Sequence, residues 1–154
     1  MTVAISVAAL AVSLSALLAT RWRDRRDLLL RMHERLITTD QQRGRRLVYK
    51  MSESGMRVED LTDEQYELVN NALASLNTLG IYYQRRYVRR RDLLEIWSEA
   101  LVSLLRPAET FLAHRDALPG GGRWPQLQVL AHDARQYLRQ QGKDLEAIEA
   151  SASR

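Results

Sequence analysis

An uncharged apolar run opens the chain, and arginines follow it at once. Residues 2–20 contain no charged side chain, and four of the next six residues are arginine. As a helix that rises ~1.5 Å per residue, the run would span roughly 28 Å, close to the ~30 Å hydrocarbon thickness of a bilayer. The pattern therefore predicts a transmembrane anchor over residues 1–20 with a cationic collar made by Arg21, Trp22, Arg23, Arg25 and Arg26.

The position of the arginines predicts how such an anchor is oriented. Short flanks rich in Lys and Arg stay on the cytoplasmic side of a membrane, and here every flanking arginine follows the run. We therefore expect an inner (plasma) membrane protein with its N-terminus outside and its remaining domain in the cytoplasm. A cleavable signal peptide would need a positively charged start, which the chain lacks. A buried core helix of a soluble protein is the other alternative.

The segment after the collar continues the helical pattern. There is no Gly or Pro between Leu17 and Ile37, so the anchor is expected to run directly into a cytosolic helix. Leu29, Met32 and Leu36 are spaced by three and four residues, which gives this helix a narrow apolar stripe. The sequence thus predicts a continuous stalk that needs a partner helix along its stripe.

A second helix is expected to begin where that pattern is interrupted. Thr39 followed by Gln42 matches a capping box, and the helix should end between Ser52 and Gly55. Gly44 lies inside it, at a cost of ~1 kcal/mol relative to Ala. A tight helix crossing would explain that glycine.

In two longer predicted helices, apolar residues recur without a break at alternating intervals of three and four positions. The first is opened by a capping box, Thr62 to Gln65, and the second continues in phase past Pro107. A short connection near Val88 would make them antiparallel neighbours, and Gly80 is expected to mark a close approach between helices. The predicted helix-packing seam comprises Tyr66, Val69, Leu73, Leu76, Gly80, Tyr83, Tyr87, Leu94, Trp97, Leu101 and Leu104.

The C-terminal part completes a helical fold. Residues 118–122 form a Pro/Gly loop, and Pro125 suits the first turn of a last helix. No segment alternates with period two, so we predict an all-α protein whose N-terminal transmembrane helix continues into a cytosolic antiparallel helical bundle. The expected divisions are an anchor at 1–20, a cytoplasmic bundle at 21–142 and a flexible tail at 143–154.

Few side chains in the chain suggest a reaction. Cysteine is absent, which excludes a disulfide framework and thiolate chemistry, and His33, His114 and His132 lie far apart without a metal-ligand spacing. We therefore predict no catalytic, metal or cofactor site. A small hydrolase or metal site that uses His114 and His132 is a much weaker alternative.

The arginines are the more informative charged residues. Residues 1–91 carry 16 Lys/Arg against 10 Asp/Glu, whereas residues 92–154 carry 7 against 9. The collar could contact anionic lipid headgroups, where a basic residue contributes about 1 kcal/mol, or could serve only as a topology signal. Nucleic-acid binding through Arg43–Arg46 and Arg85–Arg91 is an alternative, but it is less favoured because the neighbouring tyrosines belong to the seam.

The order of these features resembles a known bacterial family. Leu61–Glu64, Leu73–Gly80 and Leu94–Trp97 follow an N-terminal anchor and an Arg-rich helix. That order is similar to a family of membrane-anchored helical proteins classed as a domain of unknown function, over roughly residues 21–140. The resemblance implies architecture and a bacterial membrane setting. We therefore expect a non-enzymatic single-pass protein whose bundle is an interaction or scaffolding module or an accessory subunit, with the bilayer and a protein or a second copy as partners.

Overall fold

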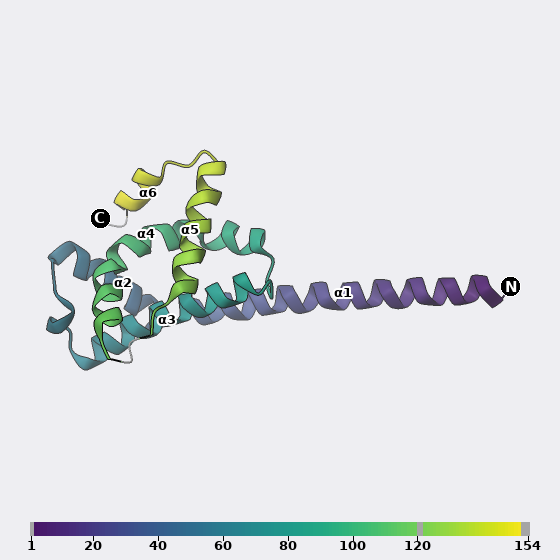
Figure 1. Cartoon of the computed structure of the whole chain (residues 1–154), viewed down its shortest axis with the longest axis horizontal. Helices are drawn as coiled ribbons and strands as arrows, with labels where there is room; N and C mark the ends of the chain where they lie inside the picture. Colours follow the sequence, from purple (N-terminus) through teal and green to yellow (C-terminus); the bar gives the residue numbers. More distant parts are fainter. Residues whose placement is uncertain (1, 120–121, 152–154) are drawn as a thin grey trace.

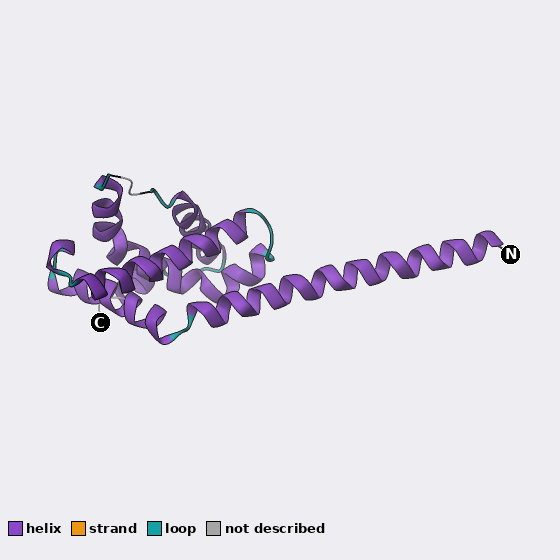
Figure 2. Cartoon of the chain, turned by 90° about the horizontal axis from the view of Figure 1, so that it is seen from below, coloured by secondary structure: helices purple, strands orange, loops and turns teal. Residues whose placement is uncertain are grey.

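Helical periodicity dominates the sequence, and every regular element among the described residues of the computed structural model is a helix (Figure 2). The structure describes residues 2–119 and 122–151, and the side chains of residues 2–9, 11 and 151 lie outside the description. The all-α prediction is confirmed. In chain order the elements are α1 (Thr2–Leu36), α2 (Thr39–Ser54), the 3₁₀ turn η1 (Val58–Asp60), α3 (Asp63–Gln84), α4 (Arg90–Ala117), α5 (Pro125–Gln140) and α6 (Leu145–Ser151).

Helix α1 is one continuous helix that enters the bundle at its C-terminal end and projects from it as a long arm (Figure 1). Its uninterrupted course follows from the lack of Gly and Pro, as predicted. Leu29, Met32 and Leu36 are 9%, 6% and 0% exposed, and this end of α1 packs against α2 and α3. The apolar stripe of the stalk is therefore covered by the bundle itself.

The membrane predictions do not agree with the structure. Among the described residues, no helix combines the length and the apolar character needed to cross a bilayer, so the inner-membrane location with an outside N-terminus is corrected. The side chains of residues 1–9 and 11 of the predicted anchor lie outside the description.

The start of α2 differs from the predicted capping box. Thr38, not Thr39, is the N-cap residue, and no side chain caps the helix there. The Thr38 hydroxyl instead donates to the carbonyl of Arg35 at 3.3 Å. The side-chain amide of Gln42 donates to the carbonyl of Ile37 at 2.8 Å. Both polar groups thus stabilise the turn between α1 and α2 by binding the free carbonyls at the end of α1.

Two glycines allow helices to approach more closely than a side chain would permit. A Cβ atom at Gly44 would collide with the carbonyl oxygen of Leu68, so α2 crosses α3 at backbone contact. A Cβ atom at Gly80 would collide with the carbonyl group of Gln126, at the start of α5. Both glycines lie inside helices, and in both cases the close approach of a neighbouring helix accounts for the residue.

The long helices α3 and α4 were expected to be direct neighbours, but they pack mainly on other helices. Helix α3 packs chiefly on α2 and α5, whereas α4 packs on α5, α2 and α6. Side chains of α3 and α4 meet at both ends, where the Tyr66 and Phe111 ring centroids are 5.1 Å apart and where Arg90 lies 4.7 Å from the centroid of the Tyr83 ring. Helix α4 continues through Pro107 without a break. The arrangement is a helical bundle in which α5 packs against both long helices.

The C-terminal segments are held by side chains from elsewhere in the bundle. Trp124 is the N-cap of α5 without a capping side chain, and Asn77 of α3 supplies the missing acceptor by binding the backbone N–H of Leu127 at 3.1 Å. Part of the expected flexible tail is helical, since α6 packs against α4 and Glu149 accepts hydrogen bonds from Arg135. The bundle therefore extends beyond residue 142.

Candidate functional site

The histidines of the chain have three different environments. The Nδ1 atom of His114 lies 3.1 Å from Glu59, and His132 lies 3.1 Å from Gln136 on the next turn of its helix. Asp133, which follows His132 in the sequence, accepts a hydrogen bond from Tyr83. The described residues contain no group of three His, Cys, Asp or Glu side chains placed to hold a metal ion. The absence of enzymatic activity stays a prediction.

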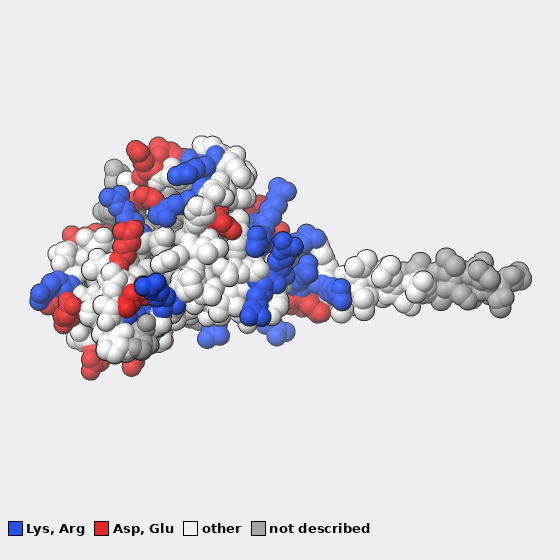
Figure 3. Space-filling model, viewed as in Figure 1, with Lys and Arg blue, Asp and Glu red and all other residues white. Residues whose placement is uncertain are grey.

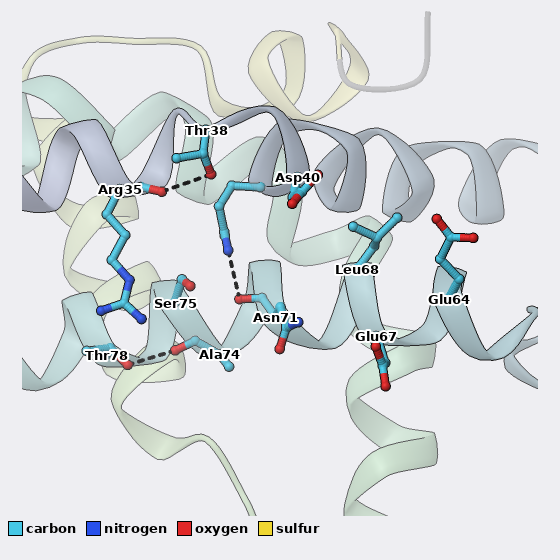
Figure 4. A pocket seen from close by; sticks show the side chains of 11 residues that line it. Arg35, Thr38, Asp40, Glu64, Glu67, Leu68, Asn71, Ala74, Ser75 and Thr78 are labelled. Atoms are coloured by element: carbon cyan, nitrogen blue, oxygen red, sulfur yellow. Dashed lines mark hydrogen bonds between the residues drawn. The ribbon is translucent and has the colours of Figure 1, made fainter.

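A polar groove of about 600 Å³ lies between the α1–α2 turn and α3. Figure 4 shows Arg35 near Ser75 and Thr78 toward one end of it, and Glu64 and Glu67 toward the other. The remaining lining includes amides, of which Gln41 donates to the carbonyl of Asn71 at 3.4 Å. Its carboxylates are exposed, and the groove contains neither histidine nor cysteine. It offers hydrogen bonds and separated charges to a ligand, but no nucleophile held against a base.

The arm presents an apolar ridge that no other helix of the bundle covers. Leu10, Leu14, Leu18 and Trp22 recur every four residues and are 71%, 56%, 57% and 52% exposed. Side chains four apart form a ridge along one side of a helix. We call these four residues the arm ridge.

The arm ridge leads into an apolar groove of about 530 Å³ between α1 and the start of α4. Trp22 belongs to both features, and the exposed side chains of Leu30 and Ile96 line the groove with Leu29. The His33 ring lies at the same groove, packed edge to face on Trp97 with 5.5 Å between ring centroids. Together, the ridge and the groove form a continuous apolar surface at the base of the arm.

The collar and the arginine-rich turn between α3 and α4 come together where the arm leaves the bundle. Figure 3 shows their basic side chains as one cluster at this junction. A cleft of about 400 Å³ lies between them, and we call it the arginine cleft. Its lining residues are Arg21, Asp24, Arg25, Leu28, Arg85, Arg86 and Tyr87.

The other predicted collar residues lie around this cleft. Trp22 and Arg26 line a small adjoining cleft with Arg25 and Arg89, and the Arg89 guanidinium stacks over the Trp22 ring at 4.8 Å from its centroid. Arg23 is exposed and lines neither cleft. The collar is therefore tied to the bundle through a cation–π contact that spans more than sixty residues of sequence.

Most of the seam residues are core residues, with one exception. Tyr87 lies beyond the end of α3, is 48% exposed and contacts the ring of Tyr82. The exception arises because α3 ends at Gln84 and the chain then turns, so the helical spacing no longer applies. Tyr66 is partly buried, and the buried members are Val69, Leu73, Leu76, Gly80, Tyr83, Leu94, Trp97, Leu101 and Leu104.

Tyr83 has a polar role as well as a packing role. Its hydroxyl donates a hydrogen bond of 2.8 Å to a carboxylate oxygen of Asp133 on α5. Burial, together with this carboxylate, raises the pKa of Tyr83 to about 12, although nearby Arg90 acts in the opposite direction. The seam thus contains a partly buried polar link between α3 and α5, which hydrophobic periodicity does not reveal.

Arg45 is a partly buried arginine that contacts other parts of the bundle. Its guanidinium donates to the carbonyl of Leu36 at 2.8 Å and lies 5.9 Å from the centroid of the Trp97 ring. Burial lowers the pKa of Arg45. Its side chain caps the C-terminal end of α1, so Arg45 is not part of a solvent-facing basic surface as the arginine pattern of α2 suggested.

Comparisons with known proteins give no family for this chain, because no family model, no curated protein and no solved structure matches it. The resemblance to a bacterial family of membrane-anchored helical proteins is therefore still only a prediction.

Proposed function

We propose that this protein is a non-enzymatic interaction module, in which the helical bundle holds α1 as an arm that binds an apolar helix of a partner protein. The arm ridge is the observation that carries this proposal. Its four side chains are each more than half exposed, and the bundle meets the ridge at its base, where Arg89 stacks on Trp22. In water, most helical stability comes from packing an apolar face against other elements.

The shape of the apolar surface indicates how a partner would bind. A helix laid on the arm ridge could continue into the apolar groove at Leu30 and Ile96, both about half exposed. Ridge-into-groove packing of two helices uses rows of side chains spaced by four residues, as these are. The partner is therefore expected to carry its own row of apolar side chains, and a second copy of this chain is one such partner.

Nucleic-acid binding is less favoured than it was from the sequence. Arg43 and Arg46 line a cleft on α2 with Lys50, whereas Arg85 and Arg86 line the arginine cleft at the base of the arm. The two groups share no cleft, which argues against one continuous phosphate-binding surface. Phosphate-driven binding would also weaken steeply with salt, so a salt titration with DNA and RNA tests this alternative.

The lack of cysteine in the chain makes a site-specific test of the arm direct. Leu14→Cys places a single thiol on the arm ridge, and Ser54→Cys places one on an exposed position at the end of α2. Self-association through the arm is expected to give a disulfide-linked dimer from Leu14→Cys and none from Ser54→Cys. Light scattering of the unmodified chain should then report a dimer.

A different partner would be detected with a photoreactive side chain at the same two positions in cells. We expect a defined cross-linked product from position 14. An excess of the unmodified chain should reduce the yield of this product more than an excess of a ridge variant that carries Leu14→Asp and Leu18→Asp. The proposal fails if position 14 cross-links no better than position 54 and the purified chain is monomeric.

A further inference from the structure

The arginine cleft brings together two segments that are remote in sequence. Arg21 and Arg25 come from α1, whereas Arg85 and Arg86 come from the turn that follows α3. Four guanidinium groups and a single carboxylate, that of Asp24, therefore line one cleft of about 400 Å³. Like charges in proximity repel one another, and the folded chain must offset that repulsion by some other interaction.

The four arginines of the cleft form no ion pair with the acidic side chains that the structure describes. Five ion pairs within 4.0 Å occur among the described residues, and none of them involves Arg21, Arg25, Arg85 or Arg86. The neighbouring arginines are engaged with aromatic rings instead, since Arg89 lies over Trp22 and Arg90 over Tyr83 at 4.8 and 4.7 Å. The contact between Arg89 and Trp22 holds the turn against the arm. The four guanidinium groups that line the cleft are left available to an anion.

The backbone at Arg86 is unusual for an arginine. Arg86 has a φ of 57° and is the only non-glycine residue with positive φ among the described residues. Tyr87 donates its N–H to the carbonyl of Tyr82, and Arg86 donates to Tyr83. This is the helix C-terminal arrangement in which glycine is usually found at the left-handed position. An arginine there strains the backbone, and it places a guanidinium in the cleft.

We propose that the arginine cleft binds a phosphate-bearing anion that carries at least two negative charges. The planar guanidinium group donates paired hydrogen bonds that match phosphate oxygens, and four of them surround the cleft. Tyr87, an exposed residue whose side chain carries a hydroxyl donor, also lines the cleft. The phosphate can belong to a lipid headgroup or to a soluble polyphosphate. This binding goes beyond the partner-helix function of the arm and does not depend on it.

Inorganic tripolyphosphate and vesicles distinguish the two sources. The full chain is titrated with tripolyphosphate in a calorimeter at low salt, and is separately sedimented with vesicles of neutral phospholipid, with and without an added anionic phospholipid. Binding of tripolyphosphate, or of anionic but not neutral vesicles, supports the proposal and identifies the source when it depends on the cleft. The proposal is overturned if the chain binds neither tripolyphosphate nor anionic vesicles.

A double variant and a matched control establish whether the cleft is responsible. Arg25→Gln combined with Arg86→Gly removes two charges from the cleft, whereas Arg106→Gln combined with Arg139→Gln removes two charges from exposed positions outside it. We expect the cleft variant to bind at least tenfold more weakly and the control to change by less than twofold. Equal weakening of both would show attraction to net charge alone and would overturn the proposal, whether the probe is tripolyphosphate or anionic vesicles.

Arg86→Gly alone separates ligand binding from structural damage. Glycine adopts positive φ without steric cost, so the melting temperature of this variant is expected to stay the same or rise. Its affinity for tripolyphosphate or anionic vesicles should fall severalfold at the same time. An unchanged affinity would remove Arg86 from the site and overturn the role assigned to the turn.

Discussion

Each half of α1 carries a row of apolar side chains, and the two rows have opposite surroundings. Leu29, Met32 and Leu36 form the apolar stripe of the C-terminal half, and the bundle buries them. The arm ridge forms a comparable row in the N-terminal half, where no other helix of the described chain covers it. The comparison teaches that apolar periodicity identifies a surface to be covered. It does not identify what covers it, which only the rest of the structure or a partner can supply.

The largest effect is expected from removing a side chain in the covered half. Leu36 is completely buried, so Leu36→Ala should lower the free energy of unfolding by about 2–5 kcal/mol through lost burial and a residual cavity. Urea unfolding followed by circular dichroism measures this. A loss below ~1 kcal/mol would show that the C-terminal half of α1 is not docked, and the contrast between the halves would disappear.

A somewhat smaller effect is expected where backbone contact, instead of side-chain packing, holds the bundle together. Gly80→Ala places a methyl group against the carbonyl group of Gln126 and should destabilise the fold by about 1–3 kcal/mol, because α3 and α5 must separate. Gly122→Ala is the matched control, since no atom lies within 4 Å of its added Cβ. Similar unfolding free energies for both variants would contradict the close approach.

The partly buried polar link in the bundle makes stability depend on pH in the alkaline range. Tyr83→Phe removes the hydrogen bond to Asp133 and should cost about 1–2 kcal/mol near neutral pH. Because folding raises the pKa of Tyr83 from 10.0 to about 12, the folded state holds the proton more tightly than the unfolded state. The stabilisation of the folded state by protonated Tyr83 is therefore complete below pH 10 and is lost as the pH rises toward 12.

Unfolding measured at several alkaline pH values tests this linkage. The unmodified chain should lose stability between pH 10 and 12 more steeply than Tyr83→Phe, so the gap between them narrows. Parallel curves would mean that Tyr83 has the same pKa in both states. Arg90 lies over the same ring, and Arg90→Gln serves as a control for its opposing influence on the tyrosine.

Local signals in the sequence were the ones that predicted the structure well. The capping box at the start of α3 forms as expected, since Thr62 and Gln65 exchange hydrogen bonds of 3.2 and 3.1 Å. The uninterrupted course of α1 and of α4 through Pro107 also follows from local pattern. Such features depend on residues within a few turns of one another, and one sequence contains all that is needed to recognise them.

Contacts between remote segments could not be predicted in the same way. Nothing in the spacing of Arg25 and Arg86 indicates that they share a cleft, because the turn after α3 could have pointed in any direction. Likewise, the direct pairing expected for α3 and α4 required knowing that α5 packs on both. The membrane anchor was inferred from an uncharged apolar run followed by arginines, and the described helices do not meet the requirement for a span.

The smallest effect is expected in the uncovered half of α1, and it completes the comparison. Leu18→Ala removes the same atoms as Leu36→Ala from the same helix, but its side chain is already 57% exposed. In the purified monomeric chain the free energy of unfolding should change by no more than ~0.5 kcal/mol. A loss near that of Leu36→Ala would mean that the arm ridge is buried in solution. If that loss grows with protein concentration, the covering surface is a second copy of the chain, since association stabilises the folded state by mass action.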